Sequence, residues 1–307
     1  MDNNGALEEC ENTLKPVNIV LAAISVAFTT LTVIGLIEKP GSVYEFEPEE
    51  QNPFKNKRVR FVGDGNDDIN ADGARGYLEI VSDVHTPRRR SFYERCVKRC
   101  IDIILSGFGL ILLSPVFVVI SVLVYMDDPG PVLFTQKRVG KNKAFFRLHK
   151  FRSMKMNTPA NTPTHMLENP DKYITRVGRV LRKTSLDELP QVWDIWMGNM
   201  SIIGPRPALW NQDKLVALRD GYTVSDEGRG VEIVDANSVT PGLTGLAQIS
   251  GRDELELNEK AALDREYVEK MSFIMDLKCF MGTITSVLGH KGVVEGGTGN
   301  MKESKIR

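Results

Sequence analysis

Residues 101–126 read IDIILSGFGLILLSPVFVVISVLVYM, an apolar run that carries one acid, Asp102, and is interrupted midway by Ser114 and Pro115. The run is long enough for a helix that crosses a bilayer. Pro115 removes a helical N–H and its ring meets the carbonyl of Ile111, while the hydroxyl of Ser114 can bond a backbone group that this frees. The sequence therefore predicts either a kinked spanning helix or a helix–break–helix that returns to its own side.

A second apolar run lies at residues 17–37 and contains no charged residue. About 21 apolar residues suffice to cross a bilayer as a helix. The acidic leader and the length of the run argue against a cleaved signal peptide. Cations such as Lys39 and Lys55 follow the run, so the positive-inside bias puts the rest of the chain in the cytoplasm. After one crossing there, a re-entrant hairpin at 101–126 keeps the basic clusters on its two sides together, whereas a full crossing separates them.

Charge is balanced overall but clustered locally. The 39 Lys and Arg residues offset 40 acids, and a net charge of −1 gives no general attraction to nucleic acid. Basic residues gather at 88–99, 137–152 and 176–183, which indicates a phosphate ligand or an anionic membrane surface. The four cysteines have neither the spacing of a zinc site nor that of a disulfide framework.

Two adjacent acids stand out in residues 182–191, RKTSLDELPQ. A helical apolar pattern follows them, so we expect Asp187 and Glu188 at a helix N-terminus, which stabilises carboxylates and attracts phosphate. Ser185 and Glu188 also fit a simple capping box. That alternative would put Pro190 at a costly fifth helical position. Asp187 as the cap would return Pro190 to the tolerated first turn and leave Glu188 free to point elsewhere.

Several cations are candidates for binding phosphate near these acids. Arg182 is the last of three arginines, after Arg176 and Arg179, that form a basic stripe at helical spacing. Arg206 stands between two prolines that leave it little freedom. Arg252 closes a second turn-rich stretch. A guanidinium held in this way suits bidentate phosphate recognition. Lys150 and Arg152 belong to a mixed basic and aromatic strand at 144–152, for which a solvated sheet edge is the alternative explanation.

Several motifs together resemble one family over residues 92–297. In chain order they are Lys98-Arg99 with Asp102, Ser114-Pro115, PVLFTQKRVG at 131–140, KFRSM at 150–154, LDELPQ at 186–191, GPRP at 204–207, PGLTG at 241–245, Gly251-Arg252 and DREYV at 264–268. This order and spacing is similar to that of the monotopic phosphoglycosyl transferases, also called polyprenyl-phosphate sugar-1-phosphate transferases or bacterial sugar transferases. Residues 1–91 lie outside the resemblance.

The resemblance implies a fold and an organisation. The fold would be a mainly helical α/β, membrane-associated monotopic domain with a re-entrant helix–break–helix at Ser114-Pro115, preceded by an N-terminal transmembrane helix. The expected segments are a tail at 1–16, the transmembrane helix at 17–37, a linker or small accessory module at 38–91, a basic juxtamembrane segment with the re-entrant helix at 92–130, the catalytic domain at 131–297 and a tail at 298–307. The catalytic domain would lie on the cytoplasmic face of a bacterial inner membrane.

The resemblance also implies a reaction: sugar-1-phosphate moves from a UDP-sugar to undecaprenyl phosphate, and UMP is released. Asp187 would be the catalytic nucleophile and Glu188 the ligand of Mg²⁺, which relieves the repulsion between a carboxylate and a diphosphate. We expect Lys98 and Arg99 near the lipid phosphate. Further substrate-binding cations would be Lys150, Arg152, Arg182, Arg206 and Arg252.

Two other functions stay open from the sequence. A noncatalytic membrane adaptor would use the basic clusters to hold anionic lipid, and the two acids only to cap a helix. A membrane glycosyltransferase would leave both phosphates on the nucleotide and release UDP. Nucleic acid is not expected as a partner, and a homodimer is left open.

Overall fold

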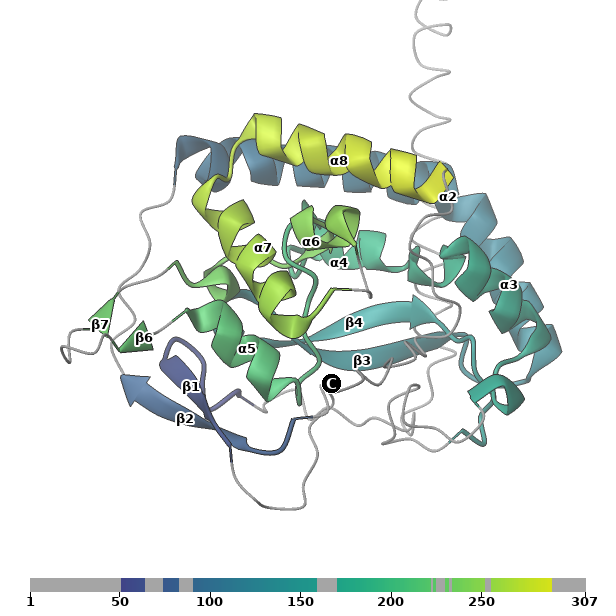
Figure 1. Ribbon diagram of the computed structural model, residues 1–307. Coiled ribbons are helices and arrows are strands. Elements are labelled where there is room, and N and C mark those ends of the chain that lie inside the picture. Colours follow the sequence, from purple (N-terminus) through teal and green to yellow (C-terminus); the bar gives the residue numbers. More distant parts are fainter. Residues whose placement is uncertain are drawn as a thin grey trace, which may run out of the picture.

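The computed structural model describes residues 51–63, 74–82, 91–158, 170–221, 223–224, 230–231, 234–251 and 255–288. The expected transmembrane helix at 17–37 and the tails at 1–16 and 298–307 lie outside these ranges. The described part is a mixed helix and strand structure, in agreement with the predicted class (Figure 1).

Strands in the described residues pair two by two. A hairpin joins β1 (Arg58–Val62) to β2 (Tyr77–Ser82), and a longer one joins β3 (Leu133–Val139) to β4 (Phe145–Phe151). The short strands β5 (Ser201–Ile203) and β8 (Gly242–Thr244) pair in parallel, and β6 (Thr223–Val224) pairs with β7 (Gly230–Val231). The strand predicted at 144–152 corresponds to β4. Within 38–91 the sequence also has short β-like stretches at 59–62 and 77–81, which correspond to β1 and β2.

Helices surround these hairpins. In chain order they are α2 (Lys98–Asp127), α3 (Arg176–Thr184), α4 (Gln191–Met197), α5 (Asp213–Asp220), α6 (Leu246–Ser250), α7 (Leu257–Glu269) and α8 (Phe273–Leu288). The sequence also predicts helices at 211–219, 257–270 and 273–288, the last two from their amphipathic pattern, and these correspond to α5, α7 and α8. A capping box between Glu256 and Glu259 starts α7.

Helix α2 is the one helix among the described residues that is long and apolar enough to cross a membrane. The helix is continuous from Lys98 to Asp127 with Pro115 inside it, so the expected break is a bend within one helix rather than a gap between two. The Ser114 hydroxyl donates to the carbonyl of Ile111 at 2.8 Å, which confirms the predicted compensation for the missing N–H. Figure 1 shows the first part of α2 along the same edge as α8 and its later part turning toward α3.

Both halves of α2 pack against the same domain. Near the start, the Asp102 carboxylate accepts a hydrogen bond from the backbone N–H of Ile202 at 3.0 Å. Near the end, Phe117 and Val124 are buried against Phe151 of β4 and other apolar side chains of β3 and α3. The opposite side of the helix is apolar and exposed along its length.

The β1–β2 hairpin packs on α5. Val59 and Leu78 are buried there against Leu215 and Val216. The part of residues 38–91 that the structure describes is therefore a packed module rather than a linker.

Candidate active site

The two acids lie in a separate turn between two helices. Ser185 ends α3 in a left-handed conformation, with φ of 57°, and Leu186–Glu188 forms a 3-10 turn. Pro190 is the N-cap of α4, where it costs little because it precedes the first helical turn. The turn has no side-chain cap from Ser185, so the capping-box alternative is wrong, and so is the expectation that Asp187 itself is the cap of α4. The acids are left for other contacts.

Glu188 is held by two cations that reach it from other elements. Lys150 Nζ of β4 lies 2.8 Å from Glu188 Oε1, and Arg206 Nη2 lies 2.7 Å from the same oxygen. Burial alone would raise the pKa of Glu188, but the positive charges of Arg206 and Lys150 outweigh it and hold the pKa well below its usual range. The two cations therefore favour the ionised form of Glu188, the form in which a carboxylate binds a metal ion.

Asp187 differs from its neighbour. Burial raises its pKa, the repulsion of Glu188 adds to this, and the cations of Lys150 and Arg182 act in the other direction. The Asp187 carboxylate accepts a hydrogen bond from its own backbone N–H, but no other described side chain bonds it, and it remains partly exposed. A carboxylate made more basic by burial and bonded by no other side chain is suited to act as a nucleophile.

Arg182 lies beside this acid, as the sequence predicted. Its Nε donates to the Ser153 hydroxyl at 2.9 Å, and Asp187 is the acid that interacts with it most strongly. Burial lowers the pKa of Arg182, whereas Asp187 raises it. The basic stripe of α3 thus brings at least one guanidinium to the acid turn.

Arg206 is fixed by its backbone as well as by Glu188. The carbonyl of Arg206 accepts a hydrogen bond from Arg219 Nη2 at 2.9 Å, and Pro205 and Pro207 flank it. The turn before it lies against β8 so closely that a Cβ on Gly242 would come within 2.1 Å of the backbone nitrogen of Gly204. Only glycine permits this approach.

Arg138 is a site residue that the sequence analysis missed. Its Nη1 donates to the Pro207 carbonyl at 2.9 Å, and its Nε and Nη2 donate to Gln136. Burial and the nearby Arg206 lower the pKa of Arg138. Strand alternation could have found it, because Arg138 and Lys150 lie on one face once β3 and β4 pair.

Other predicted cations have different partners. Arg152 pairs with Asp128 at 2.9 Å, at the end of α2, rather than with the acid turn. Lys98 Nζ lies 2.5 Å from Asp276 of α8, and both side chains are buried. Arg99 donates to the carbonyls of Ile195 and Trp196, at 2.6 and 2.8 Å, and so caps the C-terminal end of α4. Arg252 lies outside the described residues.

The donor set fits a magnesium ion that is shared with a substrate. Among the described residues no group of three or more His, Cys, Asp or Glu side chains gathers as a complete metal cage. Mg²⁺ commonly takes only one or two carboxylates and completes its shell with phosphate oxygens and water. Both cations reach Oε1 of Glu188, and no described residue bonds its other oxygen. That oxygen and Asp187 are available to such an ion.

An apolar surface accompanies the site. On α8, Ile274 is 77% exposed, and on α2, Ile104 and Met126 are 67% and 73% exposed. Further exposed apolar side chains on the two helices are Leu105, Phe108, Leu112, Val119, Val122, Tyr125, Phe273, Leu277 and Met281. Exposed apolar side chains along two helices are typical of contact with a membrane.

Comparison with known proteins identifies a family and several related proteins. Residues 93–290 match the family model described as bacterial sugar transferase. An exopolysaccharide production protein PSS of Rhizobium leguminosarum bv. phaseoli is 36% identical over 197 residues, which cover 62% of this chain and 95% of that protein.

Two longer relatives have names that state their substrates. The UDP-glucose:undecaprenyl-phosphate glucose-1-phosphate transferase of Escherichia coli K12 is 39% identical over 196 residues, and the UDP-N-acetylgalactosamine-undecaprenyl-phosphate N-acetylgalactosaminephosphotransferase of Aeromonas hydrophila is 34% identical over 195. The matches cover 62% of this chain but only 40% and 44% of those two proteins.

Proposed function

The chain belongs to the bacterial sugar transferase family, an enzyme family, and from this premise we propose that it transfers sugar-1-phosphate from a UDP-sugar to undecaprenyl phosphate. The products are undecaprenyl-diphosphate-sugar and UMP. One phosphoanhydride replaces another, so the exchange needs no further energy source. The names of the relatives support this donor and acceptor class and a role in exopolysaccharide assembly.

The first step is attack by Asp187. An oxygen of its carboxylate forms a bond to the phosphorus that carries the sugar, and the bond from that phosphorus to the bridging oxygen breaks. The electron pair leaves with UMP. What carries this assignment is the difference between the two acids: Oε1 of Glu188 accepts from Lys150 and Arg206, whereas no other described side chain bonds the Asp187 carboxylate.

The second step regenerates the free carboxylate of Asp187. A phosphate oxygen of undecaprenyl phosphate attacks the same phosphorus, and the bond from phosphorus to Asp187 breaks. Neither step requires a proton to be moved, which agrees with a site rich in fixed cations and without a general base next to the nucleophile in the described residues.

Fixed positive charge would stabilise the phosphoryl group in both steps. Lys150 and Arg206 hold Glu188, and Arg182 lies next to Asp187, so all three are placed beside the reacting centre. Magnesium, held by Glu188 and the donor phosphates, would supply further charge neutralisation. The cations bind and orient the diphosphate against the nucleophile.

A monotopic placement supports this chemistry. A straight 30-residue helix is about 45 Å long, so a spanning α2 would carry its far end away from the domain. Instead both halves of α2 contact that domain, and only the opposite side is apolar and exposed. We propose that α2 enters and leaves the bilayer on the cytoplasmic face and brings the lipid phosphate to a water-borne donor.

The Asp187→Asn variant tests the proposal. An amide cannot form the acyl phosphate, so we expect UMP release from UDP-glucose or UDP-N-acetylgalactosamine to fall by about 10³-fold or more with undecaprenyl phosphate and Mg²⁺ present. Glu266→Gln, an exposed acid of α7 that pairs with Lys270, is the control and should retain activity.

Three outcomes would count against the proposal. Undiminished turnover in Asp187→Asn would show that Asp187 is not the nucleophile. Release of UDP instead of UMP would identify a glycosyltransferase. No binding of any UDP-sugar by the wild-type chain would favour the adaptor.

A further inference from the structure

The β1–β2 hairpin lies outside residues 93–290, which match the family, yet it reaches into the same core. Val59 is 1% exposed and packs with Leu215 and Val216 of α5. Helix α5 has only eight residues, too short to be stable alone in water. Its position therefore depends on what it packs against, and the hairpin is one of its largest neighbours.

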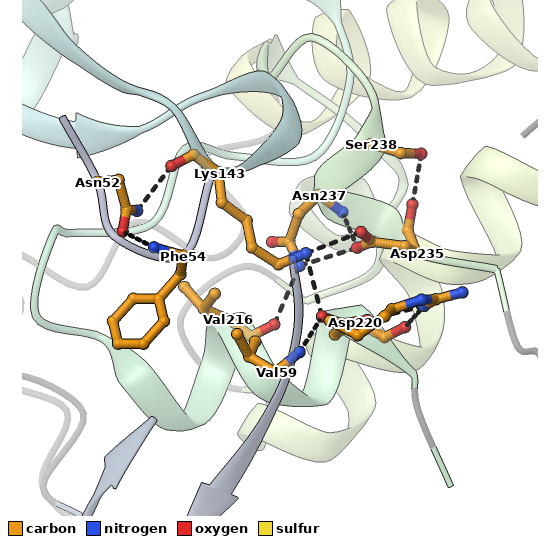
Figure 2. A network of polar contacts seen from close by, with 10 residues as sticks. Asn52, Phe54, Val59, Lys143, Val216, Asp220, Asp235, Asn237 and Ser238 are labelled. Carbon is orange, nitrogen blue, oxygen red and sulfur yellow. Dashed lines mark hydrogen bonds and ion pairs between the residues drawn. The ribbon is translucent and has the colours of Figure 1, made fainter. Parts of the chain in front are cut away.

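Polar contacts fix the C-terminal end of α5 to the hairpin. Arg58 Nη1 donates to Asp220 at two points, to the carbonyl oxygen at 2.8 Å and to Oδ1 at 2.7 Å. The backbone N–H of Val59 donates to Asp220 Oδ2 at 2.8 Å. The Asp220 side chain is fully buried, and Figure 2 shows it within a larger polar network.

A second cation, Lys143, belongs to the same polar network. Lys143 is fully buried, and its Nζ lies 3.0 Å from both Asp220 and Asp235 (Figure 2). The Asn52 amide, from the segment before β1, donates to the Lys143 carbonyl at 2.6 Å. Arg58 and Lys143 both face Asp220, so removal of either cation weakens the compensation of a buried carboxylate.

Helix α5 connects this network to the acid turn. Arg219, next to Asp220 in sequence, donates to the Arg206 carbonyl at 2.9 Å and pairs with Asp264 of α7. Arg206 in turn reaches Glu188 at 2.7 Å. A continuous set of contacts thus runs from Arg58 through the end of α5 to a cation beside the nucleophile.

We propose that Arg58 is a positioning residue: through Asp220 and α5, the N-terminal hairpin holds Arg206 against Glu188. This inference rests on the proposed function for its effect on the reaction. The hairpin is then a working part of the catalytic unit, although it lies outside the segment that defines the family.

The full chain with Arg58→Met tests it. Lys143 and the Val59 N–H still hold Asp220, so the variant keeps part of the network. We expect kcat/KM for UMP release to fall about tenfold, since small displacements of a positioning group are costly. Arg58→Lys should recover part of the loss. The control is Arg60→Met on the same strand, whose pair with Glu79 is exposed, and it should match wild type.

A double-mutant comparison separates positioning from general destabilisation. In an Arg206→Lys background, Arg58→Met should reduce kcat/KM less than about twofold, because the interaction it supports is already weakened. An equal fold loss in both backgrounds would overturn the inference, as would full activity in Arg58→Met.

Hydrogen exchange gives a readout that does not depend on activity. In Arg58→Met, peptides covering residues 204–220 should exchange faster than in wild type, while those of α8 stay unchanged. Faster exchange throughout the chain would show only loss of stability and would overturn the inference. If the wild-type chain releases no UMP but shows the selective change, the proposed function fails and the structural link between Arg58 and Arg206 stands.

Discussion

At the scale of single residues, the site depends on how two adjacent carboxylates are treated differently. Both cations that reach Glu188 bond the same oxygen, Oε1. Asp187, one residue earlier, is influenced by Lys150 and Arg182 without a hydrogen bond to either. The two carboxylates thus differ in their surroundings rather than in chemical type, which suits the roles proposed for them, Glu188 as a metal ligand and Asp187 as the nucleophile.

Removal of one of these cations should affect the reaction more than the fold. We expect Lys150→Met to lower kcat by about 100-fold, because a preorganised charge beside the phosphoryl group is lost. Lys155→Met is a matched control, since Lys155 is exposed and its hydrogen bonds in the structure use the backbone. UMP release and the thermal midpoint, measured together, check the prediction. A parallel fall of both would indicate a structural role for Lys150.

At the scale of elements, the bend of α2 depends on Ser114 and Pro115. The Ile111 carbonyl that loses its backbone donor is satisfied by the Ser114 hydroxyl, so the bend leaves no unpaired group at that point. This allows both halves of the helix to follow the domain surface.

Pro115→Ala should straighten α2. It restores a helical N–H and removes a residue that costs about 3 kcal/mol in a helix interior, so the helix itself gains stability. We nevertheless expect UMP release in lipid nanodiscs to fall about tenfold, because Phe117 and Val124 would leave their packing sites. Val119→Ala, which shortens an exposed side chain of the same helix, should be close to wild type. Full activity of Pro115→Ala would contradict the prediction, because it would mean that the bend forms without the proline.

Local pattern predicted the elements well. Helical and strand periodicity gave α7, α8, β1, β2 and β4 to within one or two residues, since each has one apolar face. The turn at Ser185 was missed because its left-handed conformation gives a serine no distinctive signal.

Long-range contacts were harder to predict. Lys150, Arg152 and Arg206 were all predicted to bind phosphate near the two acids. Lys150 and Arg206 lie next to Glu188, whereas Arg152 pairs with Asp128. Arg58 and Asp220 are 162 positions apart, and the local sequence around either residue does not indicate the other as its partner. Such pairs are decided by tertiary packing, which periodicity does not report.

At the scale of the whole molecule, the re-entrant placement that we propose for α2 predicts that both of its ends face the cytoplasm. Chains with a single cysteine, either the native Cys96 or an introduced Met126→Cys, both at exposed positions, should react with a membrane-impermeant thiol reagent from the same side of sealed vesicles. Retained UMP release would serve as the folding control. Labelling from opposite sides would mean that α2 spans the bilayer.

The buried pair between Lys98 and Asp276 also bears on how the chain is made. The two residues are 178 positions apart, so at ordinary ribosome speeds about 10 to 35 s pass before the acid emerges to meet its lysine. During that interval the apolar side of α2 has no finished domain beneath it. We therefore expect the bilayer to be the first surface that this helix contacts, and the rest of the domain to fold afterwards onto a segment that is already bound to lipid.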